Sequence, residues 1–557
     1  MQHEHSFLRS AKVIGICTLL SRISGLARDM ICASYFGTGM VWDAFTVAFR
    51  IPNLFRRLFG EGALSAAFIP VFTDYLENRT KAEAWQLVNI VATMLIVTLG
   101  GILIIGEIAF LIIPKITTLQ AKWELIFHLL KIMFPYVLLI CLVAMAMAVL
   151  NTLKHFFMPA LSPVALNVCI IVGVVIFSPL ISGGLDKKVF GVAIAVFVAG
   201  FVQLGMQIPV LKSTHTLTLS PMGRGKGEGD GQGIKLFKPQ LDFSHPGLIR
   251  IIRLIGPVIF GLAVVQLNVL INSFIAVGFA PSPGGPTEIT FAGMSIDYPL
   301  KSGAASVLYY GDRLIEFPLG IFGIAMATAV FPTLSTHAVR KDWANFSDAF
   351  SNALRMVFFI GIPASVGLIL LREPLVQLFY ERNAFAAESS QRTASVILFY
   401  SIGVWAYCGL HVLIRTFYSL QDTVTPVKTG VAMVFLNIIL NLTLIWYIQE
   451  GGLALSTSIC AIVQIVLLFI VLRWKIRITK GKEIVISFIK TFIATAFMAL
   501  ACWLVLKIFS VGDAGTLFKV IRLFVPLIAS LAVFAGVSYL LRAEELRQIT
   551  RGLVKRS

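Results

Sequence analysis

Apolar runs long enough to cross a lipid bilayer recur from one end of this 557-residue sequence to the other. About 20 apolar residues span the hydrocarbon core as a helix, and two clear examples are residues 86–113 and 520–541. Apolar residues make up 57% of the chain and charged residues only 13%, which is about half the charged share of soluble domains. Lipid offers no hydrogen bonds to an exposed backbone. The sequence therefore predicts an all-α polytopic membrane protein.

We expect fourteen transmembrane helices. The predicted spans are 10–35, 42–72, 86–113, 123–150, 159–180, 189–211, 248–279, 303–335, 348–371, 393–418, 428–448, 452–473, 485–509 and 519–541. The first span does not have the pattern of a cleavable signal peptide, because Arg22 and Arg28 interrupt its apolar core.

The net charge of +18 is carried mostly by alternate connecting segments. If the N-terminus is cytoplasmic, the cytoplasmic side contains the basic residues of 9–12, 79–81, 212–246, 340–341, 473–482 and 542–556. This bias follows the positive-inside rule, so we predict that both termini are cytoplasmic. Because the basic residues do not form one continuous patch, nucleic acid is not an expected partner.

The chain also contains an internal repeat. LKHFFMP (153–159) matches LQDTVTP (420–426), and AFIPVF (67–72) resembles AVFPTL (329–334), about 260 residues later in each case. Six helices separate the repeats, so both should have the same orientation in the membrane. The predicted domains are an N-lobe of six helices at 1–212, a glycine-rich cytoplasmic linker at 213–246, a C-lobe of six helices at 247–475, and two last helices with a basic tail at 476–557.

The sequence lacks the short motifs of soluble catalysis, such as HExxH, GxSxG and the nucleotide-binding loop. All seven cysteines lie in apolar segments, where they are expected to pack as small hydrophobic residues. We therefore predict no enzyme activity, metal site or disulfide. The informative signal is charge inside the membrane, which marks a substrate or ion pathway by default.

The first group of intramembrane charges is Arg22, Arg28 and Asp29, in the first helix. An ideal helix points two residues six apart about 120° away from each other. Arg22 and Arg28 would converge only if the helix broke between them, and Ser24–Gly25 would tolerate a break. We therefore expect a break at Gly25; the alternative is that Arg28 and Asp29 fasten other buried side chains.

The second group lies in the second helix. Arg50, Arg57 and Glu61 are spaced i, i+7 and i+11, which places them on one helical stripe, and Arg56 lies about 100° from Arg57. One face of this helix should therefore be wet. Pro52 predicts a bend, and the glycines beside Glu61 permit a further irregularity. The alternative is that Arg56 and Arg57 extend to the cytoplasmic surface.

The third group, in the eighth helix, is Asp312, Arg313 and Glu316. Asp312 and Glu316 share a face, so Arg313 is expected to point elsewhere, toward a cavity; the two acids could instead contact arginines of the first lobe. Guanidinium groups suit bidentate phosphate contacts, so a cavity lined by them predicts an anionic substrate. Weaker polar positions, expected to form interhelical hydrogen bonds, are Lys131, Arg415, His411, Glu107, Asn437 and Asn441.

Four motifs together carry a family resemblance. SRISGLARD (21–29), FRIPNLFRRLFGEGALS (49–65), YYGDRLIEFP (309–318) and FYSLQDTVTP (417–426) resemble the MurJ (MviN) family of lipid II flippases, in the multidrug/oligosaccharidyl-lipid/polysaccharide exporter superfamily. The resemblance runs over essentially the full length. It implies two pseudo-symmetric six-helix lobes around a central cavity, with the last two helices forming a hydrophobic groove beside it.

The resemblance implies movement of lipid II, the undecaprenyl-pyrophosphate-linked peptidoglycan precursor, to the outer leaflet of the bacterial inner membrane by alternating access. Matched by motif, Arg22, Arg28 and Arg313 correspond to the arginines that hold the pyrophosphate, and Asp29 to their companion acid. Other charged positions that the family relies on match Asp43, Arg56, Arg57 and Glu61.

Lipid II and the bilayer are the partners that the resemblance implies, with cell-wall synthesis proteins as further candidates. No cofactor is expected. Some family members have a sodium site in the second lobe, but its ligands have no clear match in this sequence. The expected energy source is therefore the membrane potential or an ion gradient.

Three alternative functions stay open at this point. The cargo could be another polyprenyl-pyrophosphate-linked oligosaccharide, such as an O-antigen or capsule unit, because the pyrophosphate is common to all of them. A membrane enzyme acting on polyprenyl-linked sugars would need a carboxylate in an outer loop, and Glu288 and Asp297 are available in 280–303. A scaffold that transports nothing is the third alternative.

Overall fold

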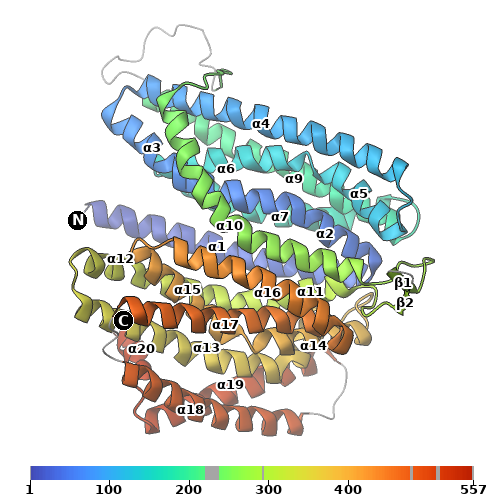
Figure 1. Ribbon diagram of the computed structural model, residues 1–557, viewed down its shortest axis with the longest axis vertical. Coiled ribbons are helices and arrows are strands. Elements are labelled where there is room, and N and C mark those ends of the chain that lie inside the picture. The colour runs from blue at the N-terminus through green and yellow to red at the C-terminus, as the bar shows by residue number, and fades with distance from the viewer. Residues whose placement is uncertain (1, 220–236, 292–293, 477–480, 510–514, 555–557) are drawn as a thin grey trace. The chain divides into compact units, whose positions relative to one another are not determined.

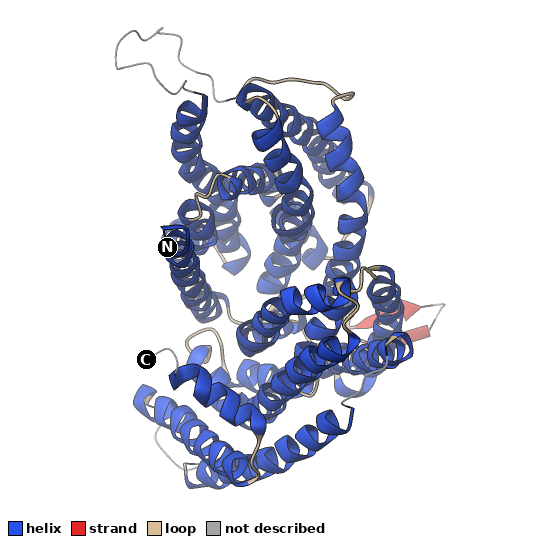
Figure 2. Cartoon of the chain, turned by 90° about the vertical axis from the view of Figure 1, so that its left-hand side faces the viewer, coloured by secondary structure: helices blue, strands red, loops and turns tan. Residues whose placement is uncertain are grey.

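The computed structural model describes residues 2–219, 237–291, 294–476, 481–509 and 515–554, and nearly all of them are helical (Figure 1). The prediction of a helical membrane protein is confirmed. The expectation that the chain is purely helical is wrong at 288–297, where β1 (Glu288–Phe291) and β2 (Met294–Asp297) pair as an antiparallel hairpin (Figure 2). The alternation of side chains in EITF and MSID suits a two-stranded ribbon.

Among the described residues, nine helices are long and apolar enough to cross a membrane. Two bent helix pairs, each with a bend of 44°, raise that number to at most eleven. The other predicted spans coincide with the three charged segments. The first helix carries three charges in its apolar stretch, and the other two segments are each interrupted by a π-helix. The count of fourteen stays a prediction.

The chain forms two compact units, and the first comprises 1–270 with 282–286. Its elements are α1 (Gln2–Phe36), α2 (Met40–Phe55), the π-helix η1 (Arg56–Ala63), α3 (Leu64–Asn78), α4 (Lys81–Ile116), α5 (Ala121–Met133), α6 (Tyr136–Thr152), α7 (Phe157–Val172), the π-helix η2 (Gly173–Phe177), α8 (Ser178–Leu180), α9 (Leu185–Leu219) and the first part of α10 (Pro246–Gly278). Phe68, Phe72, Leu87 and Leu150 are fully buried where α3, α4 and α6 pack together. This apolar core fixes the helices that follow the charged segment of α2 and η1.

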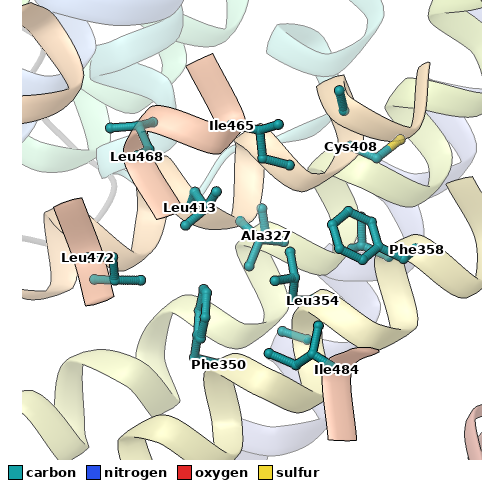
Figure 3. Close-up of a cluster of buried hydrophobic side chains, with 14 of the residues drawn as sticks. Ala327, Phe350, Leu354, Phe358, Cys408, Leu413, Ile465, Leu468, Leu472 and Ile484 are labelled. Carbon is teal, nitrogen blue, oxygen red and sulfur yellow. The ribbon is translucent and has the colours of Figure 1, made fainter. Parts of the chain in front are cut away.

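The second unit comprises 271–281 and 287–557. After the hairpin its elements are α11 (Ala304–Pro318), the π-helix η3 (Leu319–Ile324), α12 (Ala325–Val339), α13 (Trp343–Phe379), α14 (Ala387–Ser401), α15 (Val404–Ser419), α16 (Val424–Ile448), α17 (Glu450–Lys475), α18 (Gly481–Ile508), α19 (Thr516–Leu540) and α20 (Glu544–Val554). Phe350, Leu354, Leu413 and Leu468 form a buried cluster between α13, α15 and α17 (Figure 3).

The division between the compact units falls inside α10, whereas the predicted lobe boundary lies in the linker 213–246. Residues 220–236 of that linker lie outside the described residues. The predicted domain boundaries therefore stay a prediction.

The two repeated motifs adopt the same turn. Lys154 and Gln421, the second residues of LKHFFMP and LQDTVTP, have positive φ angles of 63° and 60°. In both turns the next residue donates its amide hydrogen to a carbonyl five residues earlier in the preceding helix. Two further pairs of left-handed residues have the same spacing of about 266 residues: Gly37 with Gly303, and Gly183 with Gln449. The repeat is thus visible in the backbone of each unit.

The turn between α15 and α16 is stabilised by Asp422. Its carboxylate accepts hydrogen bonds from the amide and the hydroxyl of Thr425, at 2.9 and 2.6 Å, and pairs with Lys475 at the end of α17. Burial tends to raise the pKa of Asp422, but these hydrogen bonds outweigh it and lower the pKa to about 2. The ionised carboxylate therefore ties two helix ends together.

We expect Asp422→Asn to lower the free energy of unfolding by about 1–2 kcal/mol at pH 7, because it removes an ion pair and weakens a helix cap. Since folding lowers the pKa from 3.8 to about 2, this stabilisation is complete above about pH 4 and is lost as the pH falls toward 2. Thermal unfolding of the purified protein in detergent across this range measures the difference. Glu388→Gln, which breaks only the exposed Lys301–Glu388 pair, is the control; equal losses for both variants would contradict this role of Asp422.

Candidate functional site

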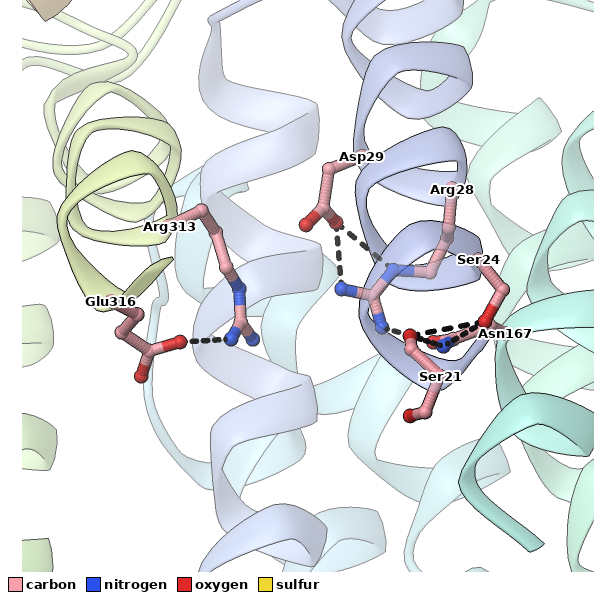
Figure 4. A network of polar contacts seen from close by, with 7 residues as sticks. All are labelled: Ser21, Ser24, Arg28, Asp29, Asn167, Arg313 and Glu316. Atoms are coloured by element: carbon pink, nitrogen blue, oxygen red, sulfur yellow. Dashed lines mark hydrogen bonds and ion pairs between the residues drawn. The ribbon is translucent and has the colours of Figure 1, made fainter. Parts of the chain in front are cut away.

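Arg28 is the centre of a buried polar network in the first unit. Its side chain comes from α1, and Arg28 and Asp29 are only 8% and 3% exposed. The guanidinium donates to one Asp29 carboxylate oxygen from Nε at 2.9 Å and from Nη2 at 2.7 Å, and to Asn167 Oδ1 from Nη1 at 2.9 Å (Figure 4). Because a carboxylate and an amide oxygen share the charge, the arginine is held in one orientation.

The predicted break of the first helix at Gly25 is wrong, because α1 runs without interruption from Gln2 to Phe36. The Asn167 amide of α7 donates to the Ser21 carbonyl at 3.2 Å and to Ser24 Oγ at 2.9 Å. A Cβ atom on Gly25 would lie 3.5 Å from Asn167 Nδ2. This is ordinary van der Waals contact, so Gly25 lies in a regular helix that packs against α7.

The continuity of α1 changes the expectation for its two arginines. On a continuous helix Arg22 and Arg28 point about 120° apart, and Arg22 is half-buried. The structure does not turn both side chains toward one point. Arg28, with Asp29 and Asn167, matches the alternative in which the charges fasten neighbouring side chains.

The second charged group extends from α2 into the π-helix η1. Arg50 is half-buried and donates from Nη1 to the Val269 carbonyl at 2.8 Å. Arg56, the first residue of η1, donates from Nε to Asn53 Oδ1 at 2.9 Å, and Arg57 is also half-buried. Arg56 thus lies against its own helix.

The predicted stripe of Arg50, Arg57 and Glu61 assumed an α-helix throughout. The backbone is instead π-helical over Arg56–Ala63, and the wider turn of a π-helix rotates later residues away from an α-helical stripe. The stripe therefore stays a prediction, whereas the irregularity expected at the neighbouring glycines is present. The side chain of Glu61 lies outside the described part of the structure.

Asp43, in the first turn of α2, is buried close to Lys122 of α5, and the two side chains interact electrostatically. The Lys122 amide also donates to Ser282 Oγ at 3.2 Å. Lys122 is not among the predicted site residues, because a lysine at the start of a span resembles a solvated loop residue. The match of Asp43 to a charged family position could have indicated Lys122, because a buried carboxylate requires a cationic or hydrogen-bonding partner.

The third charged group lies on α11 in the second unit. Arg313 Nη1 is 2.6 Å from Glu316 Oε2 (Figure 4). Its guanidinium also lies over the Tyr309 ring, at 5.0 Å from the centroid. The prediction that Arg313 points away from Glu316 is therefore wrong: an i, i+3 pair forms along the helix. Both side chains are partly exposed, and Asp312 is half-buried.

The second unit also contains a buried amide network. Asn441 donates from Nδ2 to Asn272 Oδ1 at 2.7 Å and to Asn437 Oδ1 at 2.9 Å. Asn437 in turn donates to Ser456 Oγ at 3.2 Å. These contacts join α10, α16 and α17, so the prediction of interhelical hydrogen bonds is confirmed for Asn437 and Asn441. Among the described residues, no three His, Cys, Asp or Glu side chains form a group that could hold a metal ion.

We expect Asn167→Ala to lower the free energy of unfolding by about 1–3 kcal/mol, because the buried Arg28 Nη1 loses its amide partner. Thermal unfolding of the purified protein in detergent measures this change. Asn78→Ala removes only the exposed bond to Asp74 and should leave the unfolding temperature within error of the parent. An unchanged midpoint for Asn167→Ala would show that Arg28 does not depend on this amide.

Comparisons with known proteins identify the family. Residues 32–523 match the family described as "Lipid II flippase MurJ". A "Probable lipid II flippase MurJ" from Vibrio cholerae is 36% identical over 476 residues, covering 83% of this chain and 82% of the relative. The "Lipid II flippase MurJ" of Burkholderia cenocepacia is 31% identical over 84% of each chain.

Solved structures share the fold. The structure titled "Lipid II flippase MurJ, inward closed conformation" has a TM-score of 0.73 at 23% identity, covering 95% of this chain and 99% of the other. An inward-facing multidrug resistance MATE family transporter of the MOP superfamily has a TM-score of 0.61 at 15% identity, covering 85% of this chain and 99% of the other. With nine to eleven membrane-crossing helices among the described residues, this multi-pass membrane protein belongs to the MurJ family.

Proposed function

We propose that this protein is a lipid II flippase of the bacterial inner membrane. It moves the undecaprenyl-pyrophosphate-linked precursor of peptidoglycan from the cytoplasmic to the outer leaflet by alternating access. Membership of the MurJ family along nearly the whole chain supports this function. The single observation that carries it is the placement of arginines within helices α1 and α11, which are two of the predicted membrane spans.

The charged groups have a physical reason to lie in the membrane. An anionic headgroup cannot cross hydrocarbon alone, because dehydrating its charges costs too much free energy. An arginine in a membrane helix itself costs about 2.5–3.5 kcal/mol on insertion scales. Such a cost is tolerated where the guanidinium meets an anion, and a pyrophosphate offers several oxygens for bidentate contacts.

In the proposed mechanism Arg22, Arg28 and Arg313 bind the pyrophosphate, and Arg22 does so from a different side of the continuous helix α1 than Arg28. Asp29 accepts hydrogen bonds from Arg28, and Glu316 accepts one from Arg313. Under this proposal, a phosphate oxygen takes the place of each carboxylate when the ligand binds. The remaining charged positions are proposed to keep the transport path wet and to pair with one another: Asp43, Arg50, Arg56, Arg57, Glu61 and Asp312.

We also propose fourteen membrane spans with both termini cytoplasmic, arranged as two six-helix lobes around a central cavity plus two last helices. Adding α1, α2 with α3, and α11 with α12 to the apolar helices supports this count. Exposed apolar side chains along α18 and α19, such as Phe492, Phe497 and Phe524, suit a groove for the polyprenyl tail. The membrane potential, worth about 2.3 kcal/mol per charge per 100 mV, is the proposed energy source.

We expect Arg28→Ala and Arg313→Ala each to abolish rescue of a bacterium depleted of its own flippase, because the pyrophosphate loses a bidentate partner. Lipid II on the outer face is measured with an externally added toxin that cleaves it, and membrane accumulation of each variant is measured by immunoblot. Arg253→Ala, at an exposed position of α10, is the control and should rescue fully.

Full rescue by both variants at normal accumulation would exclude the pyrophosphate role of these arginines. Failure of the parent chain to restore outer-face lipid II would contradict the flippase function itself. In that case, rescue of a strain that lacks the flippase for an O-antigen or capsule unit would identify a different polyprenyl-linked cargo.

A further inference from the structure

The position of Arg313 depends on how α11 is held. Each residue of an α-helix adds about 100° of rotation and 1.5 Å of rise, so a shift of one residue would redirect the guanidinium. At its far end α11 runs through Pro318 into the π-helix η3, where the regular hydrogen-bond pattern is interrupted. At its start it has no side-chain cap, and the residue before it, Gly303, is left-handed with φ of 91°. Its rotation and height therefore depend on contacts with neighbouring helices, and α11 packs against α14 and α17.

Arg392 of α14 supplies contacts at the start of α11. Its Nη1 donates to the Ser302 carbonyl at 2.9 Å and its Nη2 to the Lys301 carbonyl at 3.4 Å. Its Nε donates to Glu450, the first residue of α17. One planar guanidinium therefore joins the segment before α11 to two further helices.

The Arg392–Glu450 ion pair is better shielded from water than the neighbouring Lys301–Glu388 ion pair. The Arg392 and Glu450 side chains are only 14% and 5% exposed, whereas the adjacent Lys301 and Glu388 are 59% and 68% exposed. Exposed pairs contribute little, because water and salt screen them. A buried pair is held firmly once formed, since loss of either partner leaves a buried charge uncompensated.

The first unit has a partly similar arrangement. Gly37, left-handed like Gly303, precedes α2, the helix that carries Asp43 and Arg50. There the buried cation is Lys122 of α5, which interacts electrostatically with Asp43 in the first turn of α2. Both cations come from the first half of a pair of helices bent by 44°, namely α5–α6 and α14–α15. In each unit, a cation from a kinked pair thus lies at the start of a charge-bearing helix.

We propose that Arg392 is a positioning residue for Arg313, and that it fixes the rotation and height of α11 through the Lys301 and Ser302 carbonyls and Glu450. The proposal rests on the proposed function, because it assigns to Arg392 an effect on pyrophosphate binding that acts only through Arg313. Lysine cannot replace this arginine, since one point charge cannot reach Glu450 and two carbonyls at once.

The test is a double-mutant cycle on binding of undecaprenyl pyrophosphate to the purified full-length protein in detergent. We expect Arg392→Gln and Arg392→Lys each to weaken binding about tenfold or more, because a small misplacement of a binding group is costly. In an Arg313→Ala background, Arg392→Gln should cause no further loss. Lys301→Gln, which removes only the exposed pair, is the matched control and should bind like the parent.

A second measurement reports on the segment itself. The measured quantity is the rate at which a membrane-impermeant maleimide labels a cysteine introduced as Ser302→Cys. We expect this labelling to be several times faster when Ser302→Cys is combined with Arg392→Gln than when it is combined with Lys301→Gln. If Arg392→Gln does not accumulate, Glu450→Gln carries the same expectations, since it removes the ion pair from the other helix.

The outcomes separate the two proposals. Parent-like binding by Arg392→Gln, or an equal further loss in the Arg313→Ala background, overturns the positioning role, because the second result marks a general structural effect. If Arg313→Ala itself binds like the parent, the pyrophosphate role of Arg313 fails, and the positioning role fails with it. Tighter binding by Arg313→Ala than by Arg392→Gln would likewise contradict an effect that acts through Arg313 alone.

Discussion

The pairing of arginine with an acid or an amide inside the membrane is the constraint on which this structure depends. A guanidinium cannot lose its charge in a protein, so every arginine that leaves water needs compensating oxygens. Arg28 has Asp29 and Asn167, and Arg313 has Glu316 and the face of Tyr309. In both cases the nearest acid is on the same helix, which lets each helix carry its own compensated charge. An anionic ligand can then exchange with an internal acid instead of entering an empty positive site.

The same constraint explains why charge and backbone irregularity occur together. The π-helix η1 begins at Arg56, directly after α2, and the π-helix η3 follows α11, which carries Arg313. A π-helix frees backbone groups from the regular pattern, and such bulges are frequent at functional sites. Two of the three charged segments therefore read as short helices when judged by apolar length alone. Apolar length alone therefore does not identify a membrane span where a helix carries charges or contains a π-helix.

Much of the fold could be predicted from sequence because it is set by local patterns. The apolar runs and the repeated motifs at 153–159 and 420–426 specify helices and turns without knowledge of distant contacts. The partners of individual side chains could not be predicted as well, because they depend on packing between helices that are far apart in sequence. The sequence suggested a helix break at Gly25 because only the conformational freedom of glycine was visible, whereas the hydrogen bonds of Asn167 to Ser21, Ser24 and Arg28 come from a residue far away in sequence. Lys122 was missed for the same reason, because nothing near it in sequence indicates that Asp43 lies beside it.

Helices α18, α19 and α20 are attached to the second unit by side-chain contacts with α13. Arg355 of α13 is buried and forms ion pairs with Glu483 at 3.3 Å, Glu544 at 2.8 Å and Glu545 at 2.7 Å. These three acids come from α18 and α20, so one arginine ties both ends of the terminal segment to α13. Apolar side chains add to the attachment where Phe359 of α13 meets Phe534 of α19. Under the proposed mechanism, a tail lying against α18 and α19 would therefore move with the second unit, together with Arg313, rather than remain behind as the headgroup crosses.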